Sequence, residues 1–341
     1  MEPYDYRSMT LPELEQVLVS LGAQKFRAKQ FFSWLQKGAT SFDEMTNLSK
    51  DLRTTLAEKG YLANAQVEMR FESKLDETVK YLFKLNDGLL IESVLMKYHH
   101  GYSICVSTQV GCRMGCRFCA STIDGLARSL TASEILAQIM TAQRDRGVRI
   151  SNVVLMGMGE PFDNFDNVVR FLELVGDPDG LNIGARHISL STCGKVDGIY
   201  RFMELRSQLT LSVSLHAPSD EIRSSMMPIN NKWGVDELLK ACRDYIAATN
   251  RRISFEYAMI KGVNDTDECA ELLAKKLHGM LCHVNLIPAN EVRENDYERS
   301  EDARLQRFKQ LLERRGLTVT IRRTLGADIS ASCGQLRQGY K

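Results

Sequence analysis

Three closely spaced cysteines are the residues in this chain best suited to bind a redox-active metal group. Cys112, Cys116 and Cys119 lie in the run GCRMGCRFC, with three and then two residues between them. Thiolates are soft ligands that favour iron–sulfur clusters or zinc. A [4Fe-4S] cluster held by three protein thiolates leaves one iron open, and S-adenosylmethionine could chelate that iron through its amino and carboxylate groups. The spacing therefore predicts a cluster site.

A zinc site completed by a distant fourth ligand is the alternative for these cysteines. Zinc knuckles usually show paired two-residue spacings, and no second such pair occurs in the sequence. We therefore favour the cluster.

The elements that position the cysteine loop follow from an alternation of strand-like and helical segments after about residue 104. Amphipathic stretches such as TASEILAQIM and DELLKACRDYI separate the strand-like runs ICVST, VVLMG, HISLST, LTLSVSLH, ISFEYAMI, HVNLIP and TVTIRR. This pattern predicts parallel strands with crossover helices, closed or partly closed into a (β/α) TIM-like barrel. Barrels place their sites at the C-terminal ends of strands, so the cysteine loop should converge with the segments 157–160, 191–194 and 215–218.

Two smaller regions precede the predicted barrel. Capping boxes at Thr10–Glu13 and Ser41–Glu44, with glycines at 22, 38 and 60, predict a small helical domain. The runs VEMRF, VKYLFKL and LLIESVLM then predict a small β extension. We expect an α/β chain divided into an N-terminal helical domain (1–62), a β-sheet linker region (63–98), the barrel (99–320) and a C-terminal strand and loop (321–341).

Composition is typical of a globular intracellular enzyme. The 341 residues are 44% hydrophobic and 26% charged, and the nine cysteines fit a reducing cytosol better than an oxidising compartment. A membrane span needs about 18 apolar residues, and no apolar run in the sequence approaches this length. The start MEPYDYRSM lacks the basic and then apolar pattern of a signal peptide. We expect a cytoplasmic protein with no membrane association.

The net charge of +1 means that any nucleic-acid contact depends on local basic groups. The candidate cations are Lys25, Arg27, Lys29, Arg251, Arg252, Arg322, Arg323, Arg337 and Lys341.

Several separated motifs together resemble one enzyme family. The segment CVSTQVGCRMGCRFCASTIDGLARSL, with MGMGEPFDN, LSTCG, SLHAP, NLIPAN and SASCGQLR, resembles the radical S-adenosylmethionine RNA methyltransferases that act on an adenosine of large-subunit ribosomal RNA. The resemblance runs from KFRAKQFFSWL near the start to CGQLR near the end. It is strongest to the housekeeping branch, which methylates adenine carbon 2, rather than to the antibiotic-resistance branch, which methylates carbon 8.

The resemblance implies a fold, cofactors and partners. It implies a radical SAM partial barrel with one [4Fe-4S] cluster and two equivalents of S-adenosylmethionine per turnover, and an N-terminal domain that contacts RNA. The substrate would be an adenosine in the peptidyl transferase centre of 23S rRNA. Some members also methylate the adenosine 3′ of a transfer-RNA anticodon. A flavodoxin-type protein would be the electron donor, and we expect a monomer.

The residues that match the cofactor contacts of the family follow the predicted strands. Gly159 and Glu160 match the residues that bind S-adenosylmethionine, on a glycine-permissive turn that allows close approach and a carboxylate that can accept from an ammonium group. The remaining matches are Ser191, Ser214, Leu215, His216 and Asn290.

Three further residues match the family's reacting groups. Cys333 matches the cysteine that is methylated on sulfur, Cys105 the cysteine that forms a transient disulfide with it, and Glu92 the proposed proton acceptor. Carbon 2 of adenine is electron-poor and cannot attack a sulfonium methyl group, so a radical derived from methylated Cys333 is needed. Cys105 then attacks the sulfur of Cys333 and releases the product. Taken alone, Glu92 would face solvent, because it alternates with apolar residues in a strand.

Two departures from the commonest family pattern and three alternative functions stay open. Cys193 stands where serine is common in the family, a change that the site should tolerate. Ser330 stands where aspartate is common, and this change should alter how the loop that carries Cys333 is held. The alternatives are methylation at carbon 8, a radical enzyme that activates another protein, and a non-catalytic electron carrier or zinc-binding protein. A radical enzyme that activates another protein gives no role to Cys105 and Cys333. A non-catalytic protein needs neither the cofactor motifs nor a barrel of this length.

Overall fold

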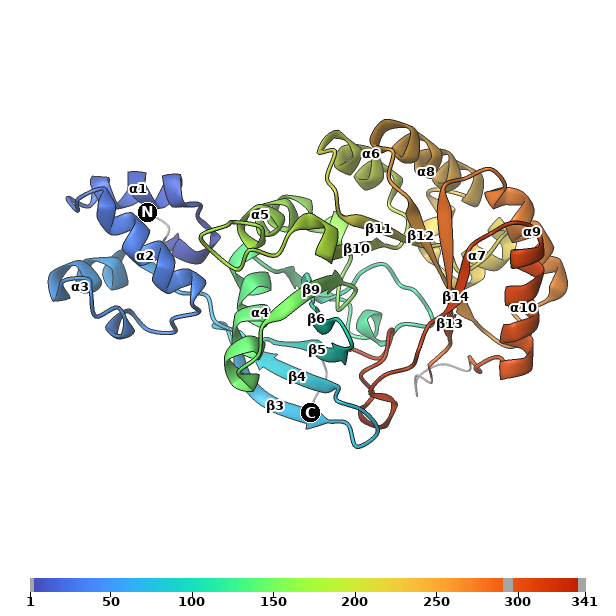
Figure 1. Cartoon of the computed structure of the whole chain (residues 1–341), viewed down its shortest axis with the longest axis horizontal. Helices are drawn as coiled ribbons and strands as arrows, with labels where there is room; N and C mark the ends of the chain where they lie inside the picture. Colours follow the sequence, from blue (N-terminus) through green and yellow to red (C-terminus); the bar gives the residue numbers. More distant parts are fainter. Residues whose placement is uncertain (1–2, 291–296, 337–341) are drawn as a thin grey trace.

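The computed structural model describes residues 3–290 and 297–336. A small helical lobe at the N-terminus lies beside a larger α/β lobe (Figure 1). Within these described residues, no helix is long and apolar enough to cross a membrane.

The N-terminal lobe forms around a small apolar core of its own, as the sequence predicts. Its elements are β1 (Tyr4–Asp5), η1 (Tyr6–Ser8), α1 (Leu11–Ser20), α2 (Phe26–Gln36), η2 (Phe42–Glu44), α3 (Lys50–Lys59) and β2 (Gly60–Tyr61). Both capping boxes form, and Glu13 accepts from the backbone N–H of Thr10 at 2.7 Å. Phe31 and Leu35 are buried in the core of this lobe, whereas Phe26 is exposed.

A ten-stranded sheet runs through the larger lobe in the described part of the chain. Its strands, in spatial order, are β14 (Val319–Ile321), β13 (Cys282–Pro288), β12 (Ile253–Met259), β11 (Thr210–Ser214), β10 (Ile188–Thr192), β9 (Ile150–Leu155), β6 (Gly101–Cys105), β5 (Leu90–Tyr98), β4 (Val79–Lys84) and β3 (Gln66–Glu72). From β6 to β14 neighbouring strands are parallel, and from β3 to β6 they are antiparallel. The predicted partial barrel is thus confirmed. The β extension continues the same sheet, because β5 pairs directly with β6.

Helices connect the parallel strands and pack against the outside of the sheet (Figure 1). They are α4 (Ala132–Arg146), α5 (Phe165–Val175), α6 (Val196–Glu204), α8 (Val235–Thr249), α9 (Asp267–Leu277) and α10 (Asp302–Arg314). The short helix α7 (Asp220–Met226) instead packs against the segment 228–231 and contacts the loops at the strand ends. The main core lies between these helices and the strands. Short elements complete the lobe: β7 (Gln109–Gly111), β8 (Leu126–Ser129), η3 (Ala120–Thr122), η4 (Pro161–Asp163), η5 (Ala185–His187), η6 (Pro228–Asn231) and η7 (Ala327–Ile329).

Candidate active site

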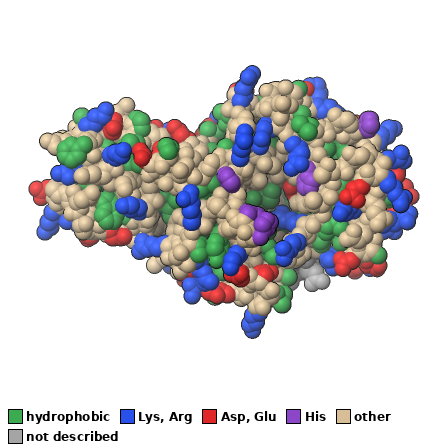
Figure 2. All heavy atoms as spheres, in the orientation of Figure 1, with side chains coloured by type: hydrophobic (Ala, Val, Ile, Leu, Met, Phe, Trp, Pro, Cys, Tyr) green, Lys and Arg blue, Asp and Glu red, His purple; other side chains and the backbone are tan. Residues whose placement is uncertain are grey.

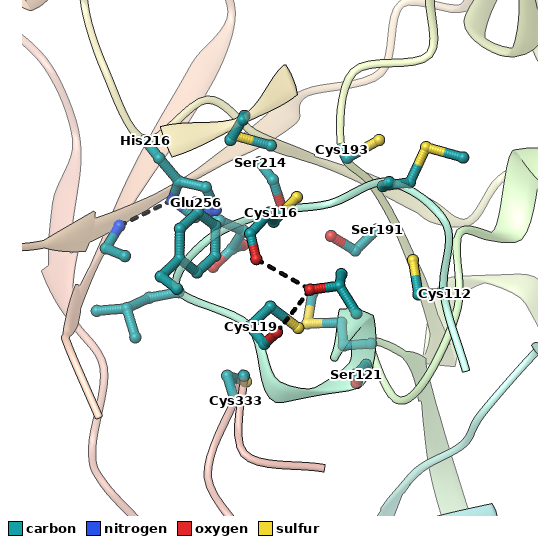
Figure 3. Close-up of a pocket in the computed structure, with 18 of the residues that line it drawn as sticks. Cys112, Cys116, Cys119, Ser121, Ser191, Cys193, Ser214, His216, Glu256 and Cys333 are labelled. Atoms are coloured by element: carbon teal, nitrogen blue, oxygen red, sulfur yellow. Dashed lines mark hydrogen bonds between the residues drawn. The ribbon is translucent and has the colours of Figure 1, made fainter. Parts of the chain in front are cut away.

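The cysteine loop follows β7 and is fixed by backbone hydrogen bonds. The N–H of Cys112 donates to the carbonyl of Gly125 at 2.9 Å, and the N–H of Cys119 donates to the carbonyl of Cys116 at 3.0 Å. The hydroxyl of Thr122 donates to the carbonyls of both Cys116 and Cys119. In Figure 3 the three cysteines face the ends of the parallel strands. Together they line one side of a cavity.

The donor set of this loop fits an iron–sulfur cluster. Burial raises the pKa of the Cys112 thiol to about 12, and the charge of Cys119 adds to this rise. Burial also raises the pKa of Cys116, and the charges of Cys119 and Cys112 raise it further. Three thiols that repel one another when ionised are stabilised as thiolates by a cationic metal group. Among residues 3–290 and 297–336, no three His, Cys, Asp or Glu side chains are placed to hold a single metal ion.

The predicted cofactor residues converge on the same cavity. Its lining includes Gly159, Glu160, Ser191, Ser214, His216 and Asn290, which come from the ends of four different strands. Leu215 is the exception: it is fully buried, does not line the cavity, and its carbonyl accepts from Arg223 at 3.0 Å.

Gly159 and Glu160 form the turn after β9. Gly159 has a φ of 100°, and a Cβ at this position would lie 2.5 Å from the Cβ of Gln109, so the turn requires glycine. The Glu160 carboxylate is buried and accepts from the N–H of Phe162 at 3.0 Å and from that of Cys193 at 2.7 Å. Burial raises its pKa. The side chains of Thr192 and Cys193 also hydrogen-bond to this carboxylate. Neighbouring residues thus hold the Glu160 carboxylate in the lining of the cavity, where a carboxylate is a suitable partner for the ammonium group of a ligand.

His216 is held in one tautomer by the backbone of β12. Its Nδ1 accepts from the N–H of Ala258 at 2.9 Å, so the proton of the neutral ring lies on Nε2. Burial and, to a smaller extent, the charge of Arg223 together lower its pKa to about 3. The ring meets Phe118 of the cysteine loop edge to face at 4.8 Å. His216 therefore offers a neutral N–H donor beside the cluster loop.

The folded state should lose stability in acid through His216. The unfolded chain binds a proton at this residue below a pH of about 6.5, whereas the folded chain keeps the ring neutral, so acid favours unfolding. We expect the stability advantage of the wild type over His216→Gln to shrink by about 2 kcal/mol between pH 7 and pH 5. Urea denaturation of the cluster-free proteins measures it. His187→Gln, at an exposed histidine, is the control. An advantage that does not change with pH would contradict the neutral His216.

Arg223 is a residue of the site that sequence reasoning missed. It lies on α7, is completely buried, and donates to the carbonyls of Leu215 (3.0 Å), Ser214 (3.1 Å) and Cys193 (2.6 Å) and to Asn230 (3.0 Å). One guanidinium thus joins the loop after β10 to the loop after β11. The signal in the sequence is a single arginine in a short helix, which carries no distinguishing pattern.

Loss of the Arg223 side chain should destabilise the fold. Arg223→Met leaves three buried carbonyls without this donor, and we expect the free energy of unfolding to fall by about 3 kcal/mol. The affinity for S-adenosylmethionine should fall as well, because Ser214 lies on the affected loop. Urea denaturation and calorimetric titration measure the two effects. Arg201→Met, on the exposed face of α6, is the control and should change stability by about 0.5 kcal/mol or less. An equal effect of the two variants would contradict the role of Arg223.

Cys105 and Cys333 come from distant parts of the sequence and line one cavity. This second cavity shares Met156, Ile287, Asn290, Arg322 and Cys333 with the first. Burial raises the pKa of Cys105 to about 12, and the charge of Cys333 adds to this rise. All nine cysteines are free, so the predicted disulfide is not present.

Arg322 is the charged side chain that the linings of both cavities share. The charge of Cys333 raises its pKa, and the charge of Arg322 lowers that of Cys105. The sequence suggested Arg322 as an RNA contact, whereas here it faces the two cysteines. Glu256 of β12, which the sequence gave no reason to select, also lines the first cavity and accepts from Asn285 at 2.7 Å.

Three hydrogen bonds connect the loop that carries Cys333 to the β3–β4 hairpin. Asp328 accepts from the hydroxyl of Ser73 at 2.7 Å and from the N–H of Lys74 at 2.8 Å, and Asp76 accepts from the N–H of Gly326 at 3.0 Å. Close to the reactive residue, Asn290 donates to the carbonyl of Cys333 at 3.0 Å. The loop therefore keeps several anchors although Ser330 replaces the commoner aspartate.

Glu92 lies in β5 and is completely buried. The prediction from the strand pattern alone, that Glu92 faces solvent, is therefore wrong. Glu92 forms an ion pair with Lys80 of β4 at 3.1 Å. It does not line either of the two cavities.

Basic side chains do not form one dominant patch on the face shown in Figure 2, where Lys and Arg are spread over both lobes and interspersed with Asp and Glu. In the N-terminal lobe, Lys25 pairs with Glu15 at 3.1 Å and Lys29 with Asp179 at 3.8 Å, and both lysines are exposed. The candidates Arg337 and Lys341 lie outside the described residues.

Comparison with known proteins matches both lobes. Residues 106–273 match the radical SAM superfamily, and residues 5–62 match the ribosomal RNA large subunit methyltransferase N-terminal domain. The chain superposes on a crystal structure of a radical SAM methyltransferase from Sphaerobacter thermophilus with a TM-score of 0.95 and 44% identity, covering 99% of this chain and all of the other.

Curated relatives extend the match to the full length. A probable dual-specificity RNA methyltransferase RlmN of Alkaliphilus oremlandii is 53% identical over 340 residues, covering all of this chain and 99% of the relative. The protein of the same name from Clostridium novyi is 55% identical over 334 residues, covering 98% and 97%. Membership of the radical SAM superfamily implies a [4Fe-4S] cluster and S-adenosylmethionine rather than zinc. The chain belongs to the RlmN family of dual-specificity RNA methyltransferases, which are radical SAM enzymes.

Proposed function

We propose that the enzyme methylates carbon 2 of an adenosine in the peptidyl transferase centre of 23S rRNA, and of the adenosine 3′ of the anticodon in transfer RNA. The observation that carries the proposal is the placement of Cys105 and Cys333 in one cavity, which shares five lining residues with the cavity of the cluster cysteines. The names of the relatives, which specify dual-specificity RNA methyltransferases, support two RNA substrates. The cytosol, where nine thiols stay reduced, is the expected location.

The cluster is held by Cys112, Cys116 and Cys119 in this proposal. Gly159, Glu160, Ser191, Ser214, His216 and Asn290, which line the cavity, would hold S-adenosylmethionine, and Leu215 would support them from outside the lining. When bound, the cluster and two equivalents of S-adenosylmethionine supply the methyl group, the hydrogen-abstracting radical, and the source and sink of single electrons.

Residues of this chain transfer the methyl carbon from S-adenosylmethionine to carbon 2 of adenine. The Cys333 sulfur first takes a methyl group, and loss of one hydrogen atom leaves a methylene carbon that bonds to adenine carbon 2. Glu92 accepts the proton from carbon 2, and the adduct gives up one electron, which restores the closed-shell aromatic ring. The Cys105 thiolate then attacks the Cys333 sulfur, the sulfur–carbon bond breaks, and its electron pair stays on carbon and takes up a proton to give the methyl group. The new disulfide is reduced by two electrons from an external donor, for which a flavodoxin-type protein is expected.

Product identification tests the proposal. The anaerobically reconstituted enzyme is given S-adenosylmethionine, reductant and unmodified 23S rRNA or transfer RNA, and the modified nucleoside is compared with 2-methyl and 8-methyl standards by mass spectrometry. We expect 2-methyladenosine, with one S-adenosylhomocysteine and one 5′-deoxyadenosine formed per methyl group. An 8-methyl product would place the enzyme in the resistance branch. Cofactor cleavage without RNA methylation would refute the assigned substrate and the role of Cys333.

A further inference from the structure

A buried lysine contacts both the predicted base and the loop of the reactive cysteine. The Lys80 ammonium lies 3.1 Å from a Glu92 carboxylate oxygen, and the exposed fractions of the two side chains are 5% and 0%. It also donates to the carbonyl of Ser330 at 3.4 Å, three residues before Cys333. The ring of Phe71 covers it at 5.0 Å. Moving two charges out of water is costly, so a buried ion pair at this position calls for a reason beyond stability.

The register of the sheet places this pair on the face that carries Cys105. Lys80 of β4 pairs with Val94 of the neighbouring strand β5, and Val94 in turn pairs with Cys105 of β6. Glu92 is two residues from Val94 on the same strand, so its side chain lies on the same face. Val94 and Cys105 both line the cavity that Cys333 reaches. The ion pair is thus next to the cavity of the two cysteines, although Glu92 does not line it.

We propose that Lys80 is a positioning residue for Glu92: its ammonium group holds the carboxylate in fixed relation to the Cys333 loop, so that the carboxylate can take the proton from carbon 2 of adenine. This inference rests on the proposed function. It assigns Lys80 to one step, the resolution of the covalent link between Cys333 and the RNA. Methylation of the Cys333 sulfur precedes that step and involves no proton transfer to Glu92.

The Cys333 loop does not depend on Lys80 alone. Asp76 and Asp328 connect it to the hairpin through three hydrogen bonds, and Asn290 holds the carbonyl of Cys333. A variant of Lys80 can therefore keep the loop in place while changing the environment of Glu92. Lys80→Gln is the most suitable change, because its amide keeps N–H donors on a side chain only one atom shorter than that of lysine but carries no charge.

The test follows two quantities in one single-turnover experiment with the reconstituted enzyme and 23S rRNA. Intact mass gives the fraction of Cys333 that is methylated, and a denaturing gel gives the amount and lifetime of the enzyme–RNA adduct. For Lys80→Gln we expect Cys333 methylation within about twofold of wild type and an adduct that resolves at least about 100-fold more slowly, on the scale of a lost general base. Lys80→Arg, which keeps the charge, should restore resolution to within about tenfold of wild type.

Matched variants separate this role from simple support of the fold. Lys97 on β5 forms an exposed ion pair with Glu77 at 2.8 Å, so Lys97→Gln should match wild type in both quantities. If Lys80→Gln lowers Cys333 methylation as much as it lowers RNA methylation, or resolves the adduct at the wild-type rate, the inference is overturned. If Lys80→Gln does not fold, Lys80→Arg decides: a folded arginine variant that methylates Cys333 but resolves the adduct as slowly as Glu92→Gln also overturns it.

Two reference variants distinguish failure of this inference from failure of the proposed function. Glu92→Gln and Cys105→Ala should both accumulate the adduct. If neither does, the proposed function is wrong. If both do and Lys80→Gln does not, only the role of Lys80 is wrong.

Discussion

We expect Cys333→Ala to abolish RNA methylation while leaving the cluster and cofactor binding intact. The alanine side chain has no sulfur to take up the methyl group, and adenine carbon 2 cannot take the group directly from a sulfonium. The rate of RNA methylation should fall by at least about 10³-fold, on the scale seen when a covalent nucleophile is removed. The measurement is 2-methyladenosine per enzyme by mass spectrometry, with iron content determined on the same preparation.

Cys242→Ala is the matched control for this experiment. Cys242 is completely buried in α8 and lines neither of the two cavities, so its replacement should leave both methylation and iron content unchanged. The assignment would be contradicted if Cys333→Ala retained methylation within about tenfold of wild type, since a methyl carrier without sulfur has no chemical route. Loss of iron in Cys333→Ala would instead mean that this residue supports the cluster loop. That second outcome has a structural basis, because the N–H of Ala120 donates to the carbonyl of Gly334 at 2.7 Å.

The sequence allowed the strands, the helices and the order of the site motifs to be predicted, because these depend on local patterns. Capping boxes act within four residues, and the alternation of strand and helix is visible in short windows. The convergence of Gly159, Ser191 and Asn290 follows from one topological rule, since parallel strands in a barrel end on the same side. The structure brings these residues to one cavity with Cys112, Cys116 and Cys119, as that rule predicts.

The residues that the sequence did not reveal are charged side chains whose role depends on contacts distant in the chain. Arg223 lies 30 residues from Cys193, to whose carbonyl it donates, and Asp328 lies 255 residues from Ser73. Nothing in the local sequence separates such a residue from a solvated surface charge. Glu92 is a case in which the local pattern gave a wrong prediction. Its alternation with apolar residues predicts an exposed side chain, because one face of such a sheet is usually solvated. Here the C-terminal loop lies near that face, and Lys80 lies within ion-pair distance of the carboxylate.

We expect Cys105→Ala to stop the reaction at the stage where enzyme and RNA are covalently joined. Once the methylene carbon of Cys333 is bonded to adenine, the sulfur–carbon bond breaks only if another thiolate attacks the sulfur. Cys105 is placed for this attack, because it lines the same cavity as Cys333. Product release should fall by at least about 10³-fold, and the adduct should approach one RNA per enzyme. A denaturing gel detects the adduct, and mass spectrometry after nuclease digestion should locate the modified nucleoside on Cys333.

Cys269→Ala, in α9, is the matched control and should release the product at the wild-type rate, because Cys269 lines neither cavity. Burial and the charge of Cys333 raise the pKa of Cys105, while Arg322 lowers it, so the attacking thiolate depends on the nearby guanidinium. If Cys105→Ala released methylated RNA at the wild-type rate, a different thiol would have to resolve the adduct. Cys193 would then be the first residue to examine, because it lines the first cavity together with Cys333 and is not one of the three cluster cysteines.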